Sequence, residues 1–169
     1  MPNTYVKIAT ITASGGTAAS LDFTSIPSTY TDLKLVASLR GTTGAQAYAT
    51  CQITVNGSSS NLTAKQLYSG GSSAASASAT AIAFEVSGVN ATASAFGIVE
   101  AYFPNYASGN NKGMSVDSCM ETNSTNAYTQ IMAGLWSQGT AINQLTIASS
   151  GFGPLAQYSS ATLYGILKS

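Results

Sequence analysis

The chain has 169 residues, which suits a single domain, and a domain of this size buries roughly 70% of its unfolded surface. It carries six basic residues, six acidic residues and no histidine, so its net charge is zero. The basic residues stand singly, which argues against a protein that binds nucleic acid through phosphates. Charge repulsion between copies of so neutral a surface is weak, which favours packing against other copies or a partner. The alternative is a soluble monomer with a hydroxyl-rich coat.

The first residues predict no secretion signal, because Met1 to Tyr5 has neither a basic nor an apolar region. No apolar run approaches the ~20 residues that span a bilayer. We therefore expect synthesis in a cytoplasm and no insertion into a membrane.

Apolar and polar side chains alternate with period two along the first half of the chain, which predicts strands. Asn56-Gly57 is a strong hairpin signal, although Ser58 to Ser60 indicates a longer loop, and the segments on either side of it are expected to pair. The predicted strands of this half are Tyr5 to Ala13, Ala19 to Phe23, Asp32 to Arg40, Tyr48 to Val55 and Asn61 to Tyr68.

Residues 69–80 are low in complexity, consisting of Gly, Ser and Ala with a final Thr80. Such a segment buries little apolar area, so we predict an exposed and mobile loop. The alternative is an Ala/Ser strand that pairs with a neighbouring strand.

The second half is centred on three amphipathic segments, Ala95 to Phe103, Lys112 to Glu121 and Ala127 to Trp136. The loops that join them, Pro104 to Asn111 and Thr122 to Asn126, are rich in turn residues and are the expected contact loops. Further strands are predicted at Ile82 to Val86, Ile142 to Ala148 and Tyr158 to Leu167.

Strands at this spacing, without a helical period, predict one all-β domain over residues 1–169. Our first choice is a two-sheet β-sandwich, a jelly roll of about 8–10 antiparallel strands. An immunoglobulin-like sandwich is the alternative, although no tryptophan lies midway between the two cysteines.

Residues that carry chemistry are few. The lack of histidine excludes Ser–His–acid and Cys–His catalysis and most zinc sites, so we predict no catalytic residue, no metal and no cofactor. Asp117 and Glu121 would lie roughly 13 Å apart along one strand, too far for a glycosidase pair. Glu100 on the preceding strand could come closer to Asp117. We interpret all three as surface carboxylates.

The two cysteines, Cys51 and Cys119, both alternate within predicted strands and are expected to be core or subsurface residues. A disulfide between them would require neighbouring strands, and two free thiols are the preferred interpretation.

Candidate contact residues lie in loops and at strand ends. Tyrosine is the main aromatic residue, with nine copies, and a tyrosine there could stack on a sugar or anchor an interface, the alternative being packing beneath the turns. With the asparagines of the contact loops, the candidates are Tyr30, Tyr68, Tyr106, Asn105, Asn110, Asn123 and Tyr158.

Several blocks of the sequence together resemble a known group. They are Thr10 to Leu33 (TITASGGTAASLDFTSIPSTYTDL), Phe103 to Tyr106 (FPNY), Gly134 to Ser137 (GLWS) and Gln157 to Leu167 (QYSSATLYGIL). The chain from Thr4 to Lys168 resembles small virion-associated proteins of tailed, especially aquatic, bacteriophages.

The resemblance implies a structural role on the surface of a phage particle, without a catalytic motif. The expected roles are capsid decoration (cement) or a head or tail fibre subunit, in a jelly-roll or related sandwich that often trimerises. The expected partners are further copies of the chain and a major capsid or fibre-base protein. The alternative is a host-recognition module that binds cell-surface glycans, and a polysaccharide-degrading enzyme is the third hypothesis.

Overall fold

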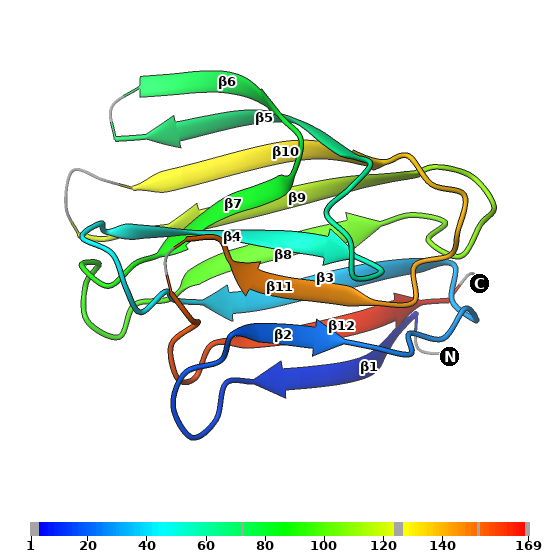
Figure 1. Ribbon diagram of the computed structural model, residues 1–169, viewed down its shortest axis with the longest axis horizontal. Coiled ribbons are helices and arrows are strands. Elements are labelled where there is room, and N and C mark those ends of the chain that lie inside the picture. The colour runs from blue at the N-terminus through cyan, green and yellow to red at the C-terminus, as the bar shows by residue number, and fades with distance from the viewer. Residues whose placement is uncertain (1–3, 72, 124–126, 152, 168–169) are drawn as a thin grey trace.

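The computed structural model describes residues 4–71, 73–123, 127–151 and 153–167. Over these residues the chain forms two antiparallel sheets that pack face to face (Figure 1). The strands are β1 (Tyr5–Thr12), β2 (Ser20–Phe23), β3 (Asp32–Leu39), β4 (Tyr48–Val55), β5 (Leu62–Gly70), β6 (Ser73–Ala79), β7 (Ile82–Ser87), β8 (Gly97–Phe103), β9 (Lys112–Met120), β10 (Tyr128–Trp136), β11 (Leu145–Ser149) and β12 (Ser160–Ile166).

The strand pairing is that of a jelly roll. The large sheet has the order β1-β12-β3-β8-β9-β10-β5-β6 and the small sheet the order β2-β11-β4-β7. With β5, β6, β9 and β10 set aside, the first strand pairs with the last in nested order: β1 with β12, β2 with β11, β3 with β8, and β4 with β7. A long hairpin rolled into two sheets has this pairing. The predicted jelly-roll sandwich is therefore confirmed, and the order is not that of an immunoglobulin domain.

Two inserted hairpins raise the number of strands in the described residues to twelve, above the predicted 8–10. The hairpin β5–β6 follows β4 of the small sheet, and the hairpin β9–β10 follows β8 of the large sheet. Both widen the large sheet on the side away from β1, and β6 forms its free edge (Figure 1).

The prediction of a mobile loop over residues 69–80 is wrong. Ser73–Ala79 forms β6, which pairs in unbroken register with β5 from Ala64 with Ala79 to Gly70 with Ser73. The segment is nevertheless largely exposed, as expected from its composition. Backbone hydrogen bonds to β5 order the segment even though its small side chains bury little apolar area.

The expected pairing across Asn56-Gly57 is also wrong, although the turn is present. Both residues have left-handed backbone, with φ of 51° and 72°, as the tight turn requires. Val55 and Ser58 close the turn through two backbone hydrogen bonds of 3.1 and 3.0 Å. The chain then crosses from the small sheet to the large one. β4 pairs with β7 and β11 in the small sheet, whereas β5 pairs with β10 in the large sheet.

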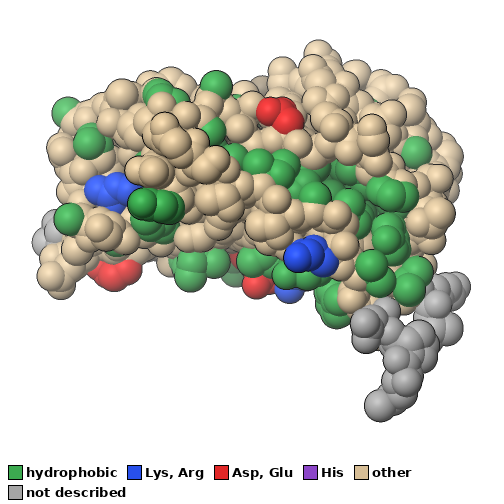
Figure 2. Space-filling model, turned by 90° about the horizontal axis from the view of Figure 1, so that it is seen from below, with side chains coloured by type: hydrophobic (Ala, Val, Ile, Leu, Met, Phe, Trp, Pro, Cys, Tyr) green, Lys and Arg blue, Asp and Glu red, His purple; other side chains and the backbone are tan. Residues whose placement is uncertain are grey.

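One hydrophobic core lies between the two sheets. Alternate residues of the central strands face inward and are fully buried, among them Leu35 of β3, Phe84 of β7 and Phe103 of β8. At the β1 edge the half-buried Ile8 and Ile11 pack against this core, and Figure 2, which looks onto that edge, shows a band of hydrophobic side chains between the layers. The core therefore occupies the full width of the small sheet.

The two cysteines are both free thiols. One lies in the core and the other on the outer face of the large sheet. Cys51 is buried on β4, as predicted, and burial raises the pKa of its thiol to about 12. Cys119 of β9 is exposed. Its prediction as a core or subsurface residue is wrong, because it shares the outward face of β9 with Asp117.

Candidate binding surface

The most distinctive surface is the outer face of the large sheet, the face turned away from the small sheet. Strand alternation places apolar side chains there as well as in the core. Of the large hydrophobic residues that are exposed in the described part of the chain, most lie on this face: Tyr5, Leu67, Ile98, Tyr102, Ile131 and Leu135.

Ile131 lies on β10, the third strand from the β6 edge of this face, and is 60% exposed. Leu67 of β5 is its direct cross-strand neighbour and is 64% exposed, and Ile98 of β8 is 53% exposed. Such cross-strand apolar pairs normally gain stability from burial. Here they remain in contact with solvent, so they are available to a partner surface.

Shallow recesses surround Ile131. The largest, of about 590 Å³, lies over β5, β6 and β10 and is lined by Leu67, Ser76 and Ala133 as well as Ile131. A second, of about 280 Å³, lies over β8, β9 and β10 and includes Ile98. Both are open grooves on a sheet face, which suit the side chains of a docked protein better than an enclosed small ligand.

The buried Gln130 of β10 explains why Ile131 faces outward. Its side-chain oxygen accepts hydrogen bonds from the backbone N–H of Glu85 (2.6 Å) and the hydroxyl of Ser118 (3.1 Å). Its amide donates to the side-chain oxygen of Gln66 at 3.3 Å. A one-residue shift of β10 would bury Ile131 but would expose this network, so the network helps to set the register.

Met132 and Trp136 favour the same register, because they share the inward face of β10 with Gln130 and are buried. Gly134 lies between them, and a Cβ at that position would meet the Met114 and Ile82 side chains at 2.7 and 2.6 Å. The larger side chains of β10 therefore fill the core around a glycine, and the smaller aliphatic stripe is left outside.

Charged groups flank the apolar stripe on one side. Glu100 of β8 lies directly opposite Asp117 of β9, so the predicted approach of these two carboxylates is confirmed. Glu100 also forms a 2.8 Å ion pair with Lys34 of β3, which raises the pKa of Lys34. All three groups lie on an open sheet face, where ion pairs contribute little to stability.

The predicted contact residues do not form one surface. Tyr30, Asn105 and Asn110 lie at the end of the sandwich that holds both termini, whereas Tyr68, Asn123 and Tyr158 lie at the opposite end (Figure 1). The expected contact loop Thr122 to Asn126 is described only as far as Asn123.

Tyr106 is the clearest error among the contact predictions. It is fully buried, its hydroxyl donates to the carbonyl of Pro27, and burial raises its pKa. It anchors the loop after β8 to the core instead of offering a contact. Tyr30 is half-buried, with its ring over Gly165, where no side chain larger than hydrogen would fit.

The remaining candidates are at least partly accessible. Asn105, Asn110, Asn123 and Tyr158 are exposed, and Asn105 and Asn123 donate their backbone N–H groups to Asp32 and Glu121 at 2.8 and 2.7 Å. Positive φ at three of them, 50° at Asn105, 54° at Asn123 and 72° at Tyr158, suits tight turns. For the two asparagines, turn geometry accounts for their presence without a ligand.

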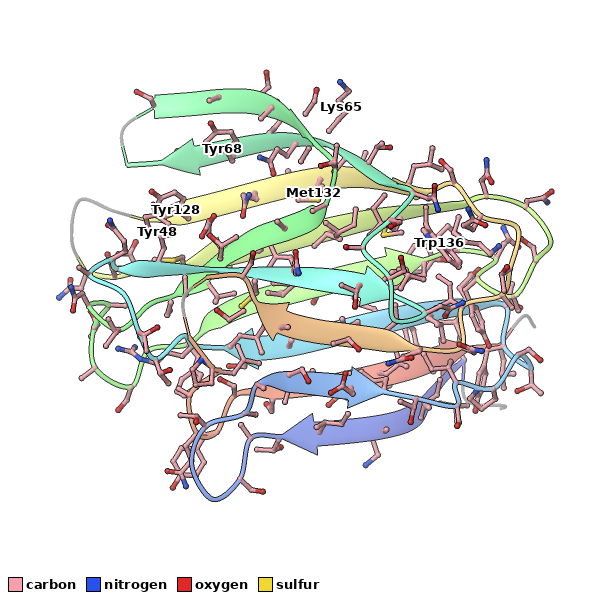
Figure 3. All side chains as sticks on the ribbon, viewed as in Figure 1. Tyr48, Lys65, Tyr68, Tyr128, Met132 and Trp136 are labelled. Carbon is pink, nitrogen blue, oxygen red and sulfur yellow. The ribbon has the colours of Figure 1, made fainter. Side chains whose placement is uncertain are left out.

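Tyr68 belongs to an aromatic group that the sequence did not identify. Figure 3 shows Tyr48, Tyr68 and Tyr128 near one another, where the large sheet extends past the edge of the small one. The rings of Tyr48 and Tyr128 lie 4.8 Å apart at 53°. Nearby, burial raises the pKa of Glu85, opposed by hydrogen bonds from Thr50 at 3.1 Å. These residues come from four strands, β4, β5, β7 and β10, so only the tertiary structure assembles them.

Over the described residues, no cluster of three or more metal-ligating side chains occurs. The same residues contain no helix long and apolar enough to cross a bilayer. Comparison of the chain with models of protein families, with curated proteins and with solved structures finds no match.

Proposed function

We propose that this chain is a non-enzymatic structural protein on the surface of a bacteriophage particle. In this role it decorates the capsid or forms part of a head or tail fibre, after synthesis in the host cytoplasm. The observation that carries the proposal is the exposed aliphatic group of Leu67, Ile98 and Ile131 on the outer face of the large sheet. The sequence blocks that resemble virion-associated proteins supply the second support.

The chemistry of this face indicates the kind of partner it accepts. The centre is aliphatic, Lys65 stands on one side of it and the Glu100–Asp117 pair on the other. A fairly flat protein surface that buries the aliphatic side chains would also cover Asp117, the direct cross-strand neighbour of Ile131, and would have to offer hydrogen-bond donors to this carboxylate. A repeating shell of capsid or fibre-base subunits offers many identical surfaces of this kind, and the neutral chain encounters no strong repulsion there.

Over the described residues, the carboxylates do not form a recognisable acid–base pair. The carboxylates that lie closest across strands, Glu100 and Asp117, are in an open groove and Glu100 is ion-paired with Lys34. General acid catalysis usually requires a carboxyl whose pKa is raised by burial. Glu85, whose pKa burial raises, lies on the other sheet opposite Thr50.

The test is to locate the chain on purified particles by immunogold electron microscopy. Label over the whole head supports decoration, and label on fibres supports the fibre role. Added Ile131→Asp protein should bind particles at least ~10-fold more weakly. The new carboxylate faces Asp117 across the strands, and burying an unpaired charge in an apolar contact costs more than about 1.4 kcal/mol. Thr10→Asp, an exposed change on the edge strand β1, is the matched control. A chain absent from particles would refute the proposal.

A host-recognition module is the second candidate, and the tyrosine group favours it. Tyr48, Tyr68 and Tyr128 could stack on a sugar, with Glu85 close enough to interact electrostatically with Tyr128. Glycan-array binding that disappears in Tyr68→Ala and persists in Tyr158→Ala would support this function. Label confined to the tail tip would favour it over decoration.

A further inference from the structure

The sandwich has four sheet edges, and three of them are protected against pairing with another chain. β1 contains Lys7 and a break in register between Lys7 and Ala9. β2 is only four residues long and contains Asp22. β7 contains Glu85, whose backbone N–H is already hydrogen-bonded to the side chain of Gln130. Charge, bulges, short length and capped backbone groups are the usual means of protecting an edge.

The fourth edge, β6, has none of these features. Its seven residues, SAASASA, contain no charged residue and no proline. Its register with β5 is continuous, so no bulge turns it away. Every second residue of such an edge strand directs its N–H and C=O away from the sheet, where they are available to another strand. Figure 1 shows this edge projecting beyond the small sheet, with no other strand beside it.

We propose that β6 pairs antiparallel with β6 of a second copy, about a two-fold axis at Ser76. The two large sheets then become one continuous sheet. The contact extends the self-association included in the proposed function by naming the segment responsible. It does not depend on the outer face around Ile131 or on the location of the protein in a virion.

The sequence of β6 suits pairing with itself. A two-fold axis at Ser76 places Ala74 opposite Ser78 of the second copy, and Ala75 opposite Ala77. All facing side chains are therefore Ala or Ser, which neither clash nor repel across strands. The nearest charge, Lys65 on β5, already donates to Ser78 of its own chain and stays away from the axis. An axis at Ser76 also pairs all seven residues of β6, from Ser73 to Ala79, and an isologous contact requires such self-complementarity.

A two-fold contact has a stoichiometric consequence. The oligomer in solution contains an even number of chains, because each β6 edge pairs with the β6 edge of one other chain. A three-fold contact elsewhere, as the virion resemblance implies, would give a hexamer with dihedral symmetry or an extended lattice. An isolated trimer would leave the β6 edges unpaired and would overturn the proposal.

The first experiment uses cysteine cross-linking in a Cys119→Ser background, since Cys51 is buried. Cα atoms of directly opposite antiparallel residues lie about 4.5–5.5 Å apart, within the range of a disulfide, so Ser76→Cys should form a disulfide-linked dimer on mild oxidation. Ser78→Cys is the matched control on the same strand and face. Its two copies lie about 13 Å apart in the proposed register and should not cross-link. Equal cross-linking of both variants, or of neither, would overturn this register.

The second experiment measures mass in solution by light scattering, using charge. Two lysines or two glutamates placed opposite each other at the axis repel. Ser76→Lys and Ser76→Glu should each halve the mass of the assembly, and an equimolar mixture of the two should restore it. Unchanged mass in both variants, or no restoration in the mixture, would contradict the β6 contact. An Ile131→Asp protein that keeps the mass of the assembly while losing particle binding would separate this contact from the proposed function.

Discussion

The most informative substitution is Gln130→Ala, because Gln130 connects both sheets and determines which face of β10 lies outward. The change removes the acceptor for the Glu85 N–H and the Ser118 hydroxyl, both near the buried Gln130 side chain. Each buried polar group left without a partner costs about 1–3 kcal/mol, so two such groups give about 2–6 kcal/mol.

We expect the free energy of unfolding to fall by about 3 kcal/mol, in the lower half of that range. Water can reach the network beside the partly exposed Gln66 and can replace some of the lost hydrogen bonding. For a domain of this size, 1 kcal/mol corresponds to roughly 2–4 °C in Tm, so the expected fall is roughly 6–12 °C. Urea unfolding followed by circular dichroism and by tryptophan fluorescence measures the free energy directly, since the single Trp136 is buried.

Gln157→Ala is the control, because Gln157 is an exposed residue of the turn before β12. It should change the free energy of unfolding by less than about 0.5 kcal/mol. An equally small effect of Gln130→Ala would refute the view that this network stabilises the register of β10.

Two further predictions concern titratable groups. Maleimide should modify Cys119 rapidly in the folded protein, whereas Cys51 should react only on unfolding, because burial raises its pKa to about 12; rapid modification of two thiols would contradict the burial of Cys51. Glu85→Gln should stabilise the protein at pH 7. Burial raises the folded pKa of Glu85, so its protonated form favours folding below the unfolded pKa, and this contribution is lost as pH rises through the folded pKa. The stability difference between variant and wild type should therefore shrink as pH falls towards 4, and a difference independent of pH would contradict the assignment.

Much of the architecture could be predicted from local pattern. Asp32 to Arg40 alternates so regularly that the strand was predicted to within a residue of β3 (Asp32–Leu39). Asn56-Gly57 identified a real tight turn because left-handed backbone strongly selects these residues. The turn did not identify the partner of β5, because a turn in a sandwich can lead to either sheet.

The candidate site was harder to predict. The exposed pair Leu67 and Ile131 belongs to segments that are distant in sequence and become neighbours only through the β5–β10 ladder. Tyr106 lies two residues after Pro104 in a turn-rich loop, which suggested exposure, yet its side chain is fully buried in the core. Loop composition describes the backbone and does not say where one long side chain can reach.

The sequence by itself determined that the chain is all-β, where most strands lie, and which residues share a face, because strand geometry alternates side chains strictly. Only the tertiary structure decided which face of each strand is inside. On β10 that choice buries Gln130 with Trp136 and exposes Ile131. It also made an edge strand of the Ser/Gly/Ala segment, through backbone bonds that need no apolar side chains. A strand with alternating side chains can turn either of its two faces towards the core. The packing and hydrogen-bond partners supplied by other strands select which face is buried.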